Sequence, residues 1–154
     1  MNIPTREYLF GSIFLLANKL QALGDAMLEE VSLKQWLLLA MIFNMDTKQP
    51  SVTEIAEFIG SSRQNVRKML EVLCAKGYVT LGVNEQDKRN LSVTLTEKTF
   101  QFFGRFEAKG AAFLEQLFDG VGSPQQESAR ITVEALFDNL ERMKIQYGKN
   151  DSRL

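Results

Sequence analysis

The strongest constraint on the fold is a pair of short helical patterns interrupted by glycine, serine and serine at residues 60–62. Before the break, residues 51–54 read Ser-Val-Thr-Glu, a capping-box sequence that opens a helix with an apolar inner face. After it, apolar residues fall at i, i+3, i+4 and i+7 from Val66 to Leu73, and Gly77 is placed to end the second helix. A short helix, a tight glycine-containing turn and a second helix predict a helix-turn-helix.

The hydrophobic period changes directly after this motif. Val79, Leu81 and Val83 alternate with polar or small residues, and residues 91–95 repeat the alternation after a polar stretch. These runs predict a β-hairpin with a charged tip, and a helix-turn-helix followed by a hairpin is the winged-helix arrangement. A long helical pattern begins at Thr96, with an aromatic stripe that is predicted to be chiefly core. Its members are Phe100, Phe103, Phe106, Phe113, Leu117 and Phe118.

Helical patterns also lie outside this block. Residues 32–35 form another capping-box sequence, which opens a helix predicted to be buried. The residues assigned to its core are Trp36, Leu37, Ala40, Met41 and Phe43. Residues 123–126, Ser-Pro-Gln-Gln, predict a helix start with Ser123 as the cap and proline at the first helical position.

The first and last helices each carry a narrow apolar seam. The first seam is Leu9, Ile13, Leu16, Leu20 and Leu23; the second is Ala129, Val133, Leu136, Leu140, Met143 and Tyr147. Such seams pack either on the chain's own core or in a bundle shared with a second copy of the chain. The predicted fold class is therefore mainly α (α+β), a winged helix-turn-helix with a two-stranded wing between N- and C-terminal helices.

The composition excludes much of enzyme chemistry. The 154-residue chain has one cysteine and no histidine, so histidine-dependent catalytic triads and imidazole-bound zinc are absent. No nucleophile–base pair, metal cluster or phosphate loop can be assembled, which predicts a protein that is not an enzyme and has no cofactor or metal. Cys74 is expected to face the core rather than to sense oxidants. The apolar residues 8–17 are too short to span a bilayer, so we expect a cytoplasmic protein with no membrane partner.

Charge is segregated along the chain. The net charge of −1 by itself argues against a polyanionic partner, but residues 61–89 contain six basic and three acidic residues. This excess of three positive charges leaves the remainder at −4. The second helix of the helix-turn-helix has a polar face without an acidic residue from Ser62 to Leu70, formed by Arg63, Gln64, Asn65, Arg67 and Lys68. These side chains suit DNA bases and phosphates, although a solvated helix face is the alternative.

Several motifs resemble the MarR family of transcriptional regulators. Residues 87–96 match its D-x-R signature followed by a strand and Leu-Thr, and residues 60–66 resemble its turn into the recognition helix. Residues 73–79 match its L-x-x-K-G-x-V exit, and the resemblance runs from about residue 32 to 100. Two departures are Leu81-Gly82, where many members have arginines, and Thr99, where the family has glycine.

The resemblance implies how the chain would work. The family fold is a homodimer in which residues 32–98 would form the winged helix-turn-helix DNA-binding domain, while residues 1–30 and 99–154 would form the helical dimerisation region. The second helix of the motif would enter the major groove, and Arg89 would reach the minor groove with Asp87 holding it in place. The candidate DNA-binding residues are Ser61, Ser62, Arg63, Gln64, Asn65, Arg67, Lys68, Lys88 and Arg89. Because Leu81 and Gly82 replace wing arginines, DNA binding should be weaker, or depend more on the wing tip, than in arginine-rich relatives.

The predicted function is a sequence-specific regulator that binds double-stranded DNA as a homodimer on a near-palindromic operator, acting as a ligand-responsive repressor. The absent histidines leave a small organic (aromatic) effector, or none, as its signal. The alternative is a winged-helix protein-interaction module without DNA binding, which the acidic isoelectric point and the missing wing arginines favour.

Overall fold

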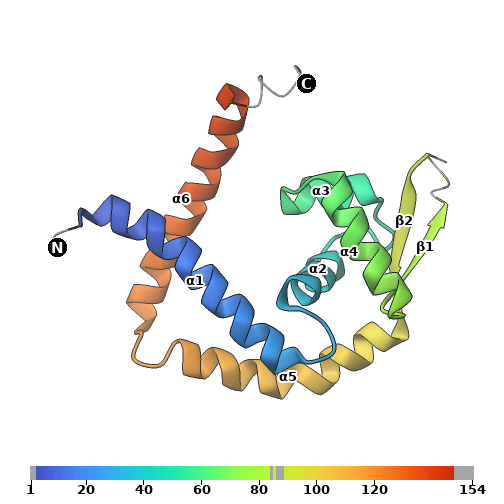
Figure 1. The fold of residues 1–154 in the computed structure, drawn as a ribbon, viewed down its shortest axis with the longest axis horizontal. Coiled ribbons are helices and arrows are strands. Elements are labelled where there is room, and N and C mark those ends of the chain that lie inside the picture. Colours follow the sequence, from blue (N-terminus) through green and yellow to red (C-terminus); the bar gives the residue numbers. More distant parts are fainter. Residues whose placement is uncertain (1–2, 84, 86–88, 148–154) are drawn as a thin grey trace. The chain divides into compact units, whose positions relative to one another are not determined.

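The computed structural model describes residues 3–83, 85 and 89–147, which contain six helices and a two-stranded antiparallel sheet (Figure 1). The elements are α1 (Thr5–Leu28), α2 (Leu33–Phe43), α3 (Val52–Ile59), α4 (Arg63–Ala75), β1 (Val79–Val83), β2 (Leu91–Leu95), α5 (Glu97–Leu117) and α6 (Ser123–Tyr147). This order confirms the predicted fold class. No helix within the described ranges has the length and apolar character needed to cross a membrane.

The chain consists of two units, Met1–Lys109 and Gly110–Leu154. The first contains the hydrophobic core, to which α2, α3, α4, the sheet and the beginning of α5 all contribute. The core residues are Leu28, Val31, Leu38, Leu39, Ile42, Val52, Ile55, Ala56, Val66, Leu70, Leu73, Tyr78, Val79, Val93 and Phe102. The second unit contains the end of α5 and all of α6, which has no buried residue.

The helix-turn-helix forms as predicted because its ends are capped locally. Ser51 Oγ accepts a hydrogen bond from the Glu54 N–H at 3.1 Å, and Glu54 Oε2 accepts one from the Ser51 N–H at 2.7 Å. The hydrogen bond from the Ser51 N–H also holds the pKa of Glu54 below its usual value. Gly60 ends α3 with a φ of 66°, in the left-handed region that glycine adopts without steric cost, and Ser62 caps α4.

The wing is a regular antiparallel hairpin attached to the helix-turn-helix. Val79 pairs with Leu95 and Val83 with Leu91. On its other side β2 reaches the segment before α3, since the Val93 N–H donates to the Pro50 carbonyl at 2.9 Å. The predicted hairpin is confirmed, and this backbone contact ties the middle of β2 to the segment that leads into α3.

The buried face of α2 differs from the prediction. Leu38, Leu39 and Ile42 are buried, whereas Leu37 and Phe43 are 50% and 56% exposed. Every residue from Trp36 to Phe43 is apolar, so the sequence pattern does not select a face and the tertiary packing decides it.

The aromatic stripe of α5 is also only partly core. Phe102, which the stripe omitted, is completely buried and packs edge-on against Tyr78, with ring centroids 5.6 Å apart. Phe100 and Phe118 are exposed. Phe100 instead contacts the exposed Phe43 ring at 6.0 Å. The core of the first unit thus selects a different edge of α5 from the one predicted.

The terminal helices are confirmed, with one change at the start of α6. The helix already includes Ser123, and the Gln125 side chain accepts a hydrogen bond from the Gly122 N–H at 2.8 Å, so Gly122 occupies the cap position predicted for Ser123. Both apolar seams are largely exposed. The exposed members are Leu9, Ile13, Leu16 and Leu23 on α1, and Val133, Leu136, Leu140, Met143 and Tyr147 on α6.

Candidate nucleic-acid interface

Helix α4 separates an apolar face from a basic one. Val66, Leu70 and Leu73 are completely buried and fix the rotation of the helix about its axis. The five polar residues predicted to contact DNA, Arg63, Gln64, Asn65, Arg67 and Lys68, are all exposed. The structure therefore brings these side chains together on the face of α4 that the core leaves open.

The turn into α4 is held by short-range hydrogen bonds. Ser62 Oγ accepts from the Asn65 N–H at 3.2 Å, and the Ser61 N–H donates to the Ala56 carbonyl at 3.0 Å. Ser61 is half-buried and Ser62 is exposed, so the two predicted turn residues differ in their exposure to solvent. The arrangement directs the positive end of the α4 dipole outward, where a phosphate would be favoured.

One acidic residue interrupts the basic face. Glu71, one residue beyond the acid-free stretch noted in the sequence, places Oε1 3.0 Å from Nε of Arg67. This pair was not among the sequence-based predictions, although a spacing of four residues on a helix is its usual signal. The charge of Arg67 is therefore partly compensated in the unbound protein.

The beginning of the second wing strand is tied to α3. Asn90 Nδ2 donates a hydrogen bond to Thr53 Oγ1 at 3.0 Å, a contact between residues 37 positions apart. Arg89, the preceding residue, is exposed. Asp87 and Lys88 lie outside the described residues, so the predicted Asp87–Arg89 pair stays a prediction.

The departure at Thr99 has a structural explanation. Its side chain is completely buried, and Oγ1 donates a hydrogen bond to the Tyr78 carbonyl at 2.5 Å. The Thr96 hydroxyl donates to the Gly77 carbonyl at 2.7 Å. Two threonines at the start of α5 thus bind the backbone that leads from α4 into the wing, which glycine at position 99 would not do.

The sequence matches known regulators. A family model described as MarR family matches residues 30–90. The transcriptional repressor MprA of Escherichia coli strain K12 is 23% identical over 146 residues, covering 93% of this chain and 83% of that protein. An uncharacterised HTH-type transcriptional regulator of Bacillus subtilis strain 168, YfiV, is 31% identical over 110 residues, covering 70% of this chain and 67% of that protein.

Solved structures show the same fold. A MarR protein from Peptoclostridium difficile superposes with a TM-score of 0.82 at 18% identity, covering 95% of this chain and 96% of that one. A MarR family regulator from Streptomyces coelicolor in complex with DNA superposes with a TM-score of 0.77 at 20% identity, covering 90% of this chain and 94% of that one. The structure of BpsR from Bordetella bronchiseptica concerns the regulation of its DNA binding by 6-hydroxynicotinic acid. It superposes with a TM-score of 0.75 at 14% identity, covering 90% of this chain and 99% of that one.

Proposed function

The chain belongs to the MarR family of transcriptional regulators, and we propose that it is a homodimeric repressor that binds a near-palindromic DNA operator. The exposed basic face of α4 carries this proposal. Arginine pairs with guanine through two hydrogen bonds, while Gln and Asn do the same with adenine, so this face suits the major groove. The family's members are regulators rather than enzymes.

The proposed contacts divide between α4 and the wing. The proposed DNA-binding residues are Ser61, Ser62, Arg63, Gln64, Asn65, Arg67, Lys68, Lys88 and Arg89. The α4 side chains would read base edges and bind phosphates, while Arg89 at the wing would enter the minor groove with Asp87 orienting it. Residues 32–98 would then form the DNA-binding domain.

The two exposed seams support the proposed dimer. Residues of α1 and α6 expose large apolar side chains, and a surface of this kind is typical of an interaction site. Residues 1–30 and 99–154 would form the bundle, which places two α4 helices about 34 Å apart on neighbouring turns of DNA. In sedimentation, a Leu136→Lys, Leu140→Lys variant should be monomeric, while Phe58→Lys, which changes an exposed residue on α3, should sediment like the parent.

Repression and its relief follow from this geometry. The similarity to MprA, a repressor, supports repression, and regulation of BpsR by a small aromatic acid supports a small organic effector for this chain. An effector that favours another spacing of the two α4 helices would weaken operator binding, and couplings of this kind amount to about 5- to 150-fold.

Selection of bound duplexes from a random pool, followed by affinity measurements at several salt concentrations, tests the proposal. The Arg63→Ala, Arg67→Ala variant should bind the selected duplex more weakly, and its log K against log salt slope should fall by about 0.9 for each phosphate that the variant no longer neutralises. Arg142→Ala, Lys144→Ala removes the same charge from α6 and should retain parental binding. Equal affinity and salt slope for the α4 variant and the parent would contradict the proposal, and a protein that selects no duplex but co-purifies with another protein would support an interaction module.

A further inference from the structure

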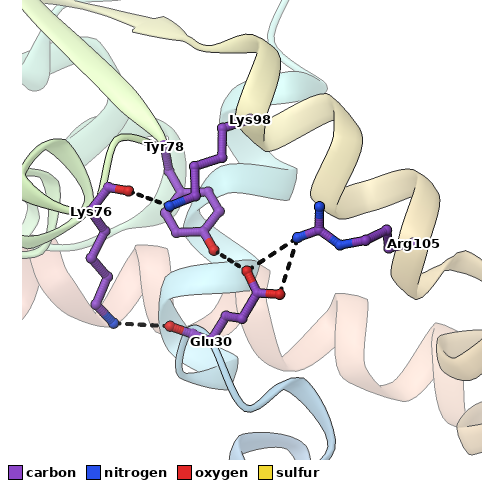
Figure 2. Close-up of polar contacts among 5 residues, drawn as sticks. All are labelled: Glu30, Lys76, Tyr78, Lys98 and Arg105. Atoms are coloured by element: carbon purple, nitrogen blue, oxygen red, sulfur yellow. Dashed lines mark hydrogen bonds and ion pairs between the residues drawn. The ribbon is translucent and has the colours of Figure 1, made fainter.

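A cluster of five polar residues lies where the end of α4, the loop between α1 and α2, and α5 meet (Figure 2). Its centre is the carboxylate of Glu30. The Tyr78 hydroxyl donates to Glu30 Oε2 at 2.7 Å, and Arg105 Nη2 lies 3.1 Å from both carboxylate oxygens. Lys76 Nζ donates to the Glu30 backbone carbonyl at 3.1 Å. Glu30, a residue of the α1–α2 loop, thereby binds side chains from the segment after α4 and from α5.

Tyr78, the tyrosine at this junction, is buried and contacts side chains of α5. Its side chain is 1% exposed, its ring contacts Phe102 of α5, and Lys98 Nζ lies 4.5 Å from the ring centroid. Lys98 also donates to the Lys76 carbonyl at 2.6 Å, as Figure 2 shows. The backbone directly after α4 is therefore attached to α5 through Lys98 and to the α1–α2 loop through Tyr78.

The loop itself is well positioned to receive these bonds. Asp25 Oδ1 accepts from the Leu33 N–H at 2.6 Å, and the Glu30 N–H donates to the Leu28 carbonyl at 2.6 Å. These contacts fix the loop from both flanking helices, so the Glu30 carboxylate faces Tyr78 and Arg105 without needing to order a flexible segment.

Charge and burial keep the cluster in one protonation state near neutral pH. The Tyr78 hydroxyl and then Arg105 lower the pKa of Glu30, so that the carboxylate remains ionised. Burial, followed by the bond to Glu30, raises the pKa of Tyr78 to about 12, so that its hydroxyl remains a donor. The network is therefore present throughout the pH range in which DNA binding would be measured.

We propose that Glu30, Tyr78 and Arg105 are positioning residues that set the orientation of α4 relative to α5, and thereby the spacing of DNA half-sites that the protein prefers. This inference rests on the proposed function, because spacing has meaning only for a DNA-binding dimer. Helix α4 carries the proposed reading face, and α5 is the helix through which the first unit continues into the proposed dimerisation region. The Arg105 ion pair and the buried Tyr78 hydroxyl meet on the same Glu30 carboxylate of the α1–α2 loop, and these directional contacts resist rotation more strongly than apolar contacts, which have no fixed direction.

Binding to duplexes of altered spacing tests this role. The selected operator is compared with versions that lack or gain one central base pair, which shifts a half-site by about 3.4 Å and turns it by roughly 35°. Tyr78→Phe and Arg105→Gln should reduce the parental preference for the native spacing by about threefold or more, the scale on which a contacting network couples. Their affinity for a duplex with one half-site should remain within about twofold of the parent's, because no proposed DNA contact is changed.

The matched control is Lys109→Gln. Lys109 lies one turn after Arg105 on α5 and makes a 3.7 Å ion pair with Glu29, so the variant removes the same charge beside the same loop. It should keep the parental spacing preference. Arg105 is half exposed, so Arg105→Gln also provides a folded variant if Tyr78→Phe does not fold.

Unchanged spacing preference in both network variants, or an equal change in Lys109→Gln, would overturn the inference. This outcome would remove only the positioning role if the parent binds its operator and the Arg63→Ala, Arg67→Ala variant does not. The proposed function would then remain intact. A parent that binds no duplex overturns both.

Discussion

Nε of Arg67 lies 3.0 Å from the Glu71 carboxylate one turn farther along α4, and both side chains are more than half exposed. If Arg67 contacts DNA as proposed, Glu71 would compete with a DNA phosphate for the same guanidinium. An exposed pair of this kind contributes about 0.2–1 kcal/mol, so it would weaken DNA binding without preventing it.

Replacing Glu71 with glutamine should therefore tighten DNA binding. We expect an affinity gain of about 1.4- to fivefold, the range that corresponds to such a pair. If the released Arg67 then contacts a phosphate, the salt slope should steepen by about 0.9. Titration of labelled operator at several salt concentrations measures both. Glu141→Gln, which breaks the pair with Lys144 on α6, makes the same charge change and should leave both values unaltered; an equal gain in that control would assign the effect to net charge.

The wing should depend on Arg89 and on the hydrogen bond beside it. Since Leu81 and Gly82 provide no basic contact at the wing base, Arg89→Ala should weaken operator binding by about fivefold or more. Asn90→Ala and Thr53→Val each remove one side of the 3.0 Å hydrogen bond that ties the wing to α3, so their losses should be similar to each other and smaller than that of Arg89→Ala. Parental affinity of Arg89→Ala would contradict the proposed dependence on the wing tip.

Stability should fall in alkali because of Tyr78. Its pKa is 10.0 in the unfolded chain and about 12 when folded, so the folded state retains the proton more strongly. The associated stability is complete below pH 10 and is lost as pH rises through about 12, by about 3 kcal/mol at most. Urea unfolding of the parent and of Tyr78→Phe at pH 9 and 12 measures this difference. Tyr78→Phe should lose less stability between pH 9 and 12 than the parent. Tyr147→Phe, which removes an exposed hydroxyl, should lose as much as the parent. Equal losses in Tyr78→Phe and the parent would show that the Tyr78 hydroxyl is not linked to folding.

Two helical glycines should respond in opposite ways to alanine. A Cβ on Gly24 would lie 2.8 Å from both Leu33 methyl carbons, whereas a Cβ on Gly104 would have no neighbour within 4 Å. Gly24→Ala should destabilise the protein by about 1–3 kcal/mol through overpacking between α1 and α2. Gly104→Ala should stabilise it by about 0.5–1 kcal/mol, because alanine loses less conformational freedom in a helix. Thermal unfolding of both variants provides the comparison, and stabilisation by Gly24→Ala would show that Leu33 moves aside freely.

Local signals predicted most of the winged helix. The capping boxes at Ser32 and Ser51 form with the expected partners, because each bond joins residues three positions apart. Gly60 ends α3, and the period-2 runs form the hairpin. The exposed α4 face was also predictable, since the apolar stripe on the opposite side determines the rotation of the helix.

Contacts between distant residues were not predictable in the same way. The face of α2 that is buried, the choice of Phe102 over Phe100, and the Thr53–Asn90 bond all depend on how separate elements pack. Apolar residues occupy every face of α2 from Trp36 to Phe43 and are numerous on α5. The sequence therefore allows several rotations of each helix about its axis, with similar burial of apolar side chains. The Arg67–Glu71 pair is different, because a four-residue spacing on a helix is by itself a sequence signal for such a pair.

The amino-acid sequence is enough to specify the helices and strands of this protein and the chemistry of α4, because caps, turns and amphipathic periods act over a few residues. The meeting of Glu30, Tyr78 and Arg105 depends instead on the tertiary structure, since Tyr78 and Arg105 lie 48 and 75 positions from Glu30 and no local pattern links them. Packing of α4 and α5 on one core brings these groups within hydrogen-bond distance, and the burial of the Tyr78 side chain then strengthens its hydrogen bond to Glu30.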